Sequence, residues 1–143
     1  MTPLENVQNL YAAYLDEAAA AEKNQHYTDG FLGFGKKASD DPCHVRFIEK
    51  LTALVKETAE SSISSAEMRD VIAFIFQAQQ DHREPASIYW ALVAAHSAVQ
   101  EGIPLLTPED TAALYQQYDS MFRRFERLPV QTKILKQLKK AMR

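Results

Sequence analysis

The sequence has little of what builds cross-linked or fibrous proteins. Its one cysteine, Cys43, excludes an internal disulfide and a zinc site made of paired thiolates. Only 4 of the 143 residues are glycine and 6 are proline, which excludes collagen-like and low-complexity chains. No apolar run approaches the roughly 20 residues that span a bilayer, and Glu5 is acidic where the start of a secretory signal is basic. These absences predict a cytoplasmic protein with no membrane span.

The composition is that of a globular domain. Hydrophobic residues make up 46% of the chain and charged residues 24%, so enough apolar surface is available to offset the entropy lost on folding. A chain of this length is the size of one domain and can bury a core without a structural metal. We therefore expect residues 1–143 to form a single domain.

Hydrophobic residues recur at helical spacing along almost the whole chain, and capping residues or prolines precede most of these segments. The predicted helices run from about residue 3 to 24, 42 to 59, 65 to 79, 85 to 102, 108 to 125 and 129 to 142. Residues 71–76 alone could also be a buried strand, but the cap at Ser64 and the length of the segment favour a helix. The fold class predicted is all-α, an up-and-down bundle of about six helices.

A second arrangement is compatible with the same helices. Their starts are spaced by about 21 to 23 residues, so helix pairs repeat about every 43 residues, a period in the range of HEAT-like repeats. Regular spacing is equally what an up-and-down bundle with short loops produces. A short HEAT-like helical-repeat arrangement is therefore the alternative to the bundle.

The segment from about 85 to 102 is apolar on nearly every side. Such a helix must be covered all round, so we expect it to be buried together with the helix before it, and any uncovered part to suit a second copy of the chain. Trp90 is interpreted as a packing residue and His96 as a core histidine. Gly102 is interpreted as the C-terminal cap of this helix.

Short connections make neighbouring helices antiparallel, which places the first, third and fifth connections at one end of the bundle. We expect that end to hold any site for a small ligand or a metal. The candidate ligand-binding residues are Phe31, Phe34, Lys36, Asp41, His44, His82 and Arg83, and the candidate metal ligands are His26, His44 and His82. Polar turns and caps collect at bundle ends without any function, so an ordinary structural role is the alternative.

No strong catalytic or cofactor motif accompanies these residues. The residues Gly30, Gly35 and Lys36 match most of a phosphate-binding loop, but Lys37 follows where that loop needs Ser or Thr, and no strand precedes it. Cys43 and His44 are adjacent in sequence, so their side chains diverge on a helix and do not form a catalytic pair. We expect no cofactor and favour a protein that is not an enzyme.

Charge is unevenly distributed along the chain. Residues 1–122 hold 8 basic and 18 acidic residues, a net charge of −10, whereas residues 123–143 hold 8 basic residues and one acidic residue, a net charge of +7. The predicted basic surface consists of Arg123, Arg124, Arg127, Lys133, Lys136 and Lys140. It can pack against the acidic body or bind a nucleic acid or another anionic surface, and the acidic body disfavours nucleic acid because it repels phosphate.

Together these features predict a protein-interaction or regulatory module, with a protein partner or self-association as its mode of action. The alternatives are a small-ligand or metal-binding protein with its site in residues 26–44 and 81–84, and a protein that binds nucleic acid or an anionic surface through its basic C-terminal helix.

Overall fold

The computed structural model describes residues 2–31, 42–80, 90–122 and 127–142, without the side chains of residues 21–31, 42 and 43. Every element in these ranges is helical. The α-helices are α1 (Pro3–Phe31), α2 (Pro42–Glu60), α3 (Ser65–Gln79), α5 (His96–Gly102), α6 (Pro108–Met121) and α7 (Pro129–Ala141). A π-helical segment, η2 (Trp90–Ala95), leads into α5, and a 3₁₀ turn, η3 (Ile103–Leu105), follows it. The predicted all-α bundle is confirmed.

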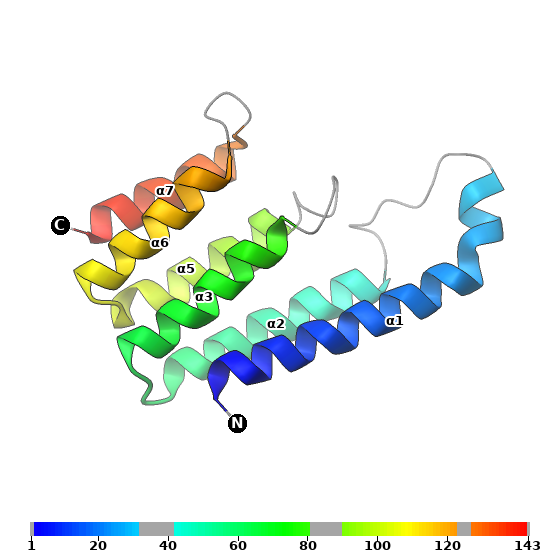
Figure 1. Ribbon diagram of the computed structural model, residues 1–143, viewed down its shortest axis with the longest axis horizontal. Helices are drawn as coiled ribbons and strands as arrows, with labels where there is room; N and C mark the ends of the chain where they lie inside the picture. Colours follow the sequence, from blue (N-terminus) through cyan, green and yellow to red (C-terminus); the bar gives the residue numbers. More distant parts are fainter. Residues whose placement is uncertain (1, 32–41, 81–89, 123–126, 143) are drawn as a thin grey trace.

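The helices form two layers. In Figure 1, α1, α3 and α6 lie side by side in front, and α2, α5 and α7 lie behind them. Neighbours within each layer pack on one another, α3 between α1 and α6, and α5 between α2 and α7. Helix pairs are therefore stacked in chain order around a common core, so the bundle also has the order of a short helical repeat.

Side-chain caps determine where three of the helices begin. Ser64 and Glu67 form a reciprocal capping box, in which Ser64 Oγ accepts from the Glu67 amide at 3.1 Å and Glu67 Oε1 accepts from the Ser64 amide at 3.2 Å. Thr2 accepts from the Glu5 amide at 3.1 Å, and Thr107 accepts from the Asp110 amide at 3.2 Å. Each bond satisfies an amide that has no partner within its helix, as the sequence predicts.

The first helix is longer than its prediction. It continues to Phe31 instead of ending near residue 24, so Gly30 and Phe31 belong to α1 and not to a glycine-rich loop. The extension follows four consecutive alanines, residues 18–21, which are the strongest helix formers. The start predicted near Pro85 for the fourth helix lies outside the described residues.

Gly102 does not cap its helix in the way predicted. Its φ is −89°, in the right-handed region, and the chain passes directly into η3. The glycine lies instead in close packing, because a Cβ at this position would lie 2.5 Å from Ile72 Cδ1 and 3.0 Å from Met68 Cε, so these side-chain ends would have to shift. Helix α5 can therefore approach α3 closely at this point.

The core lies between the two layers. Helix α3 supplies residues that are fully buried, among them Ile72, Ile75 and Phe76. Trp90 is buried as predicted, and its Nε1 donates a hydrogen bond of 3.0 Å to the backbone carbonyl of Ile75. Leu92, in contrast, is 53% exposed, so the fourth helix is not covered on all sides. Leu15 of α1 is 44% exposed as well.

Candidate functional site

Helix α7 displays a row of lysines to solvent. Lys133, Lys136 and Lys140 follow one another at steps of three and four residues, which places them within one narrow strip of the helix surface. All three are exposed, and Lys139 is exposed at the edge of the strip. The row spans about 10 Å along the helix, given a rise of about 1.5 Å per residue. We call Lys133, Lys136 and Lys140 the lysine face.

The opposite side of α7 fixes the helix in the bundle. Ile134 and Leu138 are fully buried and Leu135 is 5% exposed, so the apolar side is used for packing against α5 and α6. At the start of the helix, the Leu128 amide donates a hydrogen bond of 2.8 Å to Gln131 Oε1. The lysine face is thus a charged surface on a rigid support, and not part of a helix free to insert elsewhere.

The lysines of α7 make no ion pair within the described part of the chain. The ion pairs among the described residues join Arg46 to Glu17, Arg69 to Asp70 and Asp110, and Arg127 to Asp119. Helix α7 is therefore held to the acidic body by its apolar side rather than by its lysines. Their charge is directed outward.

Arg127, predicted as part of the basic surface, has a different environment. Its side chain is only 16% exposed, and Nη2 donates to Asp119 Oδ1 at 2.5 Å and to the Asp119 carbonyl at 3.0 Å. The guanidinium therefore stabilises the C-terminal end of α6, where cations and donors are favourable. Arg123 and Arg124 lie outside the described residues.

An exposed leucine belongs to the segment that precedes α5. Segment η2, which carries Leu92, packs against α7. His96 follows Leu92 by one turn, and its ring lies close enough to Lys133 for the ammonium to act on it. The pKa of His96 is lowered mainly by burial of the ring and secondly by the positive charge of Lys133. His96 of α5 and Lys133 of α7 therefore lie at the seam between these two helices.

His96 is half-buried at this seam, so its interpretation as a core histidine holds only in part. Its Nε2 is shielded from solvent and has no hydrogen-bond partner among the described residues. A neutral ring is favoured there, because a charged imidazolium would lose hydration and face a lysine.

The predicted ligand end of the bundle is only partly described. Figure 1 shows that the helix ends bordering residues 32–41, 81–89 and 123–126 do lie on the same side of the molecule. Most of the candidates are outside the residues or side chains described, namely His26, Phe31, Phe34, Lys36, Asp41, His82 and Arg83. The ligand and metal site at this end stays a prediction.

His44 is the one candidate of that group whose side chain is described. It is 1% exposed, and its Nδ1 is hydrogen-bonded to the Tyr14 hydroxyl at 3.0 Å. The ring lies among aromatic side chains, with the Tyr14 ring 5.8 Å and the Trp90 ring 6.4 Å away between centroids. His44 therefore belongs to the aromatic core that joins α1, α2 and η2.

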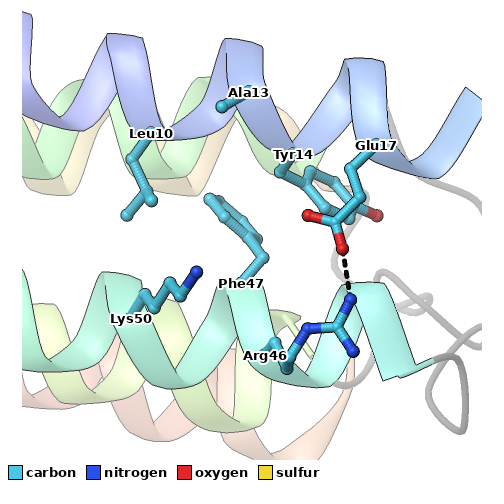
Figure 2. A pocket seen from close by; sticks show the side chains of 7 residues that line it. All are labelled: Leu10, Ala13, Tyr14, Glu17, Arg46, Phe47 and Lys50. Carbon is cyan, nitrogen blue, oxygen red and sulfur yellow. Dashed lines mark hydrogen bonds and ion pairs between the residues drawn. The ribbon is translucent and has the colours of Figure 1, made fainter.

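A shallow hollow of about 280 Å³, open space included, lies between α1 and α2. Figure 2 shows Tyr14 and Phe47 at its base, with Glu17 and Arg46 paired across it and Lys50 farther along α2. The paired side chains are about half exposed, so their attraction is weakened by solvent. The charges flanking the hollow are thus engaged with each other.

No three His, Cys, Asp or Glu side chains in the described ranges are grouped as a metal site would need. Among the helices in the same ranges, none is both long and apolar enough to cross a bilayer.

Comparisons with protein-family models, curated proteins and solved structures find no match. The site is therefore interpreted from its own residues. Sequence reasoning found the lysines of α7 but did not predict the exposure of Leu92. The available signal was the apolar excess of the fourth helix, which has more hydrophobic positions than one buried side requires.

Proposed function

We propose that the protein is an interaction module that binds an acidic segment of a partner protein through the lysine face. The observation that carries the proposal is the exposure of Lys133, Lys136 and Lys140 on a helix whose other side is buried, with no ion pair to them in the described part of the chain. Charged groups held on a rigid element lose less entropy on binding than groups on a flexible tail.

The charge of the remaining chain favours a short acidic segment over a long polyanion. Residues 1–122 carry a net charge of −10, so a nucleic acid extending beyond α7 meets repulsion from the body. A peptide of a few acidic residues needs only the lysine face. Its binding weakens with salt, because the pairs form at an exposed surface.

The test is fluorescence anisotropy with a labelled peptide of about 12 glutamates at low salt. We expect the triple variant Lys133→Glu, Lys136→Glu, Lys140→Glu to weaken binding by at least about tenfold, because exposed pairs contribute up to about 1 kcal/mol each and reversal adds repulsion. The control is Lys50→Glu, Lys56→Glu, which reverses two exposed lysines on α2.

Equal affinity of the triple variant and the unchanged protein would refute the proposal. A duplex DNA of equal charge that binds more tightly than the peptide would instead assign the face to nucleic acid. Self-association and a ligand site at residues 26–44 and 81–84 stay predictions.

A further inference from the structure

We infer that the acidic segment bound by the lysine face is the exposed side of α1 in a second copy of this chain, so that copies associate head to tail. This inference rests on the proposed function and names its partner. The contact is heterologous, because α7 of one copy meets α1 of the next and the two surfaces differ.

The first support is the opposite charge of the two helices. Over residues 3–20 of α1 the charged residues are Glu5, Asp16 and Glu17, all of them acidic. Helix α7 carries four lysines and no acidic residue. Each helix therefore presents charge of a single sign, and the two signs are complementary.

The acidic residues of α1 include two on one exposed strip. This strip, which we call the α1 strip, consists of Glu5, Asn9, Ala12 and Asp16, at steps of four, three and four residues. All four residues are exposed. The other side of the helix is buried through Val7 and Tyr11, so the α1 strip, like the lysine face, is held on a rigid support.

Both carboxylates of the α1 strip are available to a cation from another molecule. Neither Glu5 nor Asp16 forms an ion pair within the described ranges. The Glu5 carboxylate accepts a hydrogen bond of 3.1 Å from the Thr2 hydroxyl, which is a neutral donor. Glu17, in contrast, is paired with Arg46 of its own chain, so the inference does not depend on it.

The second support is the spacing of the charges. Lys133 and Lys140 are about 10 Å apart along α7, and Glu5 and Asp16 are about 16 Å apart along α1, at a rise of about 1.5 Å per residue. The flexible four-carbon stem of lysine allows the outer lysines to reach the carboxylates. Ala12 lies between the two carboxylates and is small, so it does not hold the helices apart.

A symmetric dimer through either strip is disfavoured. Pairing α1 with α1 places carboxylates against carboxylates, and pairing α7 with α7 places lysines against lysines. Both arrangements are repulsive. Opposite charges meet only when the lysine face of one copy binds the α1 strip of another.

The third support is the position of the two helices in the bundle. Helices α1 and α7 belong to the first and last helix pairs, which lie at opposite ends of the stack (Figure 1). A copy bound through one end thus leaves its other end free for a further copy, as in open heterologous assemblies. A contact of one helix with one helix is a small interface, so we expect weak and salt-dependent association.

The experiment measures sedimentation velocity at low salt over protein concentrations up to about 1 mM, where weak association is detectable. The proteins are the unchanged chain, the triple lysine variant, and an α1 variant with Glu5→Gln, Ala12→Lys and Asp16→Lys. Glutamine at position 5 keeps a residue that a capping box accepts. The matched control is Glu49→Lys, Glu109→Lys, which alters two exposed acidic residues on α2 and α6 and raises the net charge by the same amount as the α1 variant.

We expect the sedimentation coefficient of the unchanged chain and of the matched control to rise with concentration. Association of the triple lysine variant and of the α1 variant should each be at least about tenfold weaker, because like charges then meet. An equimolar mixture of these two variants should associate again, since each supplies the charge that the other has lost. Circular dichroism checks the helix content of every variant.

The outcomes separate this inference from the proposed function. If the unchanged chain stays monomeric at every concentration while the glutamate peptide binds it and not the triple lysine variant, the head-to-tail contact is wrong and the acidic partner stands. If the triple lysine variant binds the peptide normally, both fall. Association that persists in the triple lysine variant, or a mixture of the two variants that does not associate, overturns the pairing of α7 with α1.

Discussion

His96 on α5 and Lys133 on α7 are electrostatically coupled across the seam between their helices. Burial of the ring is the larger cause of the lowered pKa of His96, and the Lys133 ammonium is the second. The coupling makes His96 a reporter of the charge at one end of the lysine face. An acidic group bound to Lys133 should therefore raise the pKa of His96.

The variant Lys133→Gln is expected to raise the pKa of His96, because it removes the neighbouring positive charge. The pKa should stay below the ordinary value of a histidine, since the burial remains. Titration of the imidazole proton signals by NMR measures this change. Lys140→Gln changes a lysine two turns farther along α7 and serves as the control. It should leave the pKa of His96 unchanged. An unchanged pKa in Lys133→Gln would disprove the coupling.

Asp110 joins the starts of α3 and α6 through several polar contacts. Its Oδ2 accepts from Ser65 Oγ at 2.5 Å, and its Oδ1 accepts from Arg69 Nη1 at 2.8 Å. The hydrogen bond from Ser65 is the largest cause that lowers the pKa of Asp110, and the contacts with Arg69 add to it. A carboxyl with a lowered pKa stabilises the fold above the unfolded pKa, and this contribution is lost as the pH falls through the folded value.

We therefore predict that the unchanged protein loses stability below about pH 4 and that Asp110→Asn loses less over the same range. At neutral pH, Asp110→Asn should be the less stable of the two. Urea unfolding followed by circular dichroism at several pH values provides the comparison. Glu109→Gln, at the neighbouring exposed position, serves as control. Parallel pH profiles for Asp110→Asn and the unchanged protein would contradict the assignment.

Replacement of Trp90 tests the core. Its indole contacts the rings of Tyr11 and Phe47, at centroid distances of 5.8 and 5.4 Å, and donates to the Ile75 carbonyl. Trp90→Phe should destabilise the fold by about 2 kcal/mol, because it leaves a cavity and deprives a buried carbonyl of its side-chain donor. Urea unfolding by circular dichroism measures the loss. A change below about 0.5 kcal/mol, the range of ordinary surface substitutions, would contradict this role.

Substitutions at Gly102 test how closely α5 approaches α3. Gly102→Val should destabilise the fold by about 1 to 3 kcal/mol through overpacking against Ile72 and Met68. Gly102→Ala should cost less, since the atoms that it meets are the ends of flexible side chains. Thermal unfolding ranks the two variants. A valine variant as stable as the alanine variant would show that the contact is not tight.

Features that depend on a few adjacent residues were predictable from the sequence. The capping box at Ser64 and Glu67 spans four residues, so its pattern is visible without the rest of the fold. The lysine spacing in α7 likewise places Lys133, Lys136 and Lys140 on one strip wherever the helix lies.

Features that depend on distant neighbours were not predictable in this way. Gly102 has the sequence context of a helix cap, and only the position of α3 shows that it serves close packing. Leu92 lies in a segment that is apolar on nearly every side. The sequence pattern therefore does not show which side of the helix faces solvent. The pairing of Arg127 with Asp119 across eight residues also requires the chain to turn back after α6.

The most direct test of the lysine face as a binding surface is an NMR titration of the isotope-labelled protein with the glutamate peptide. The account predicts amide shift changes concentrated at Lys133, Lys136 and Lys140, together with a rise in the pKa of His96. Shift changes confined to α1 and α2, with the signals of α7 unmoved, would contradict it.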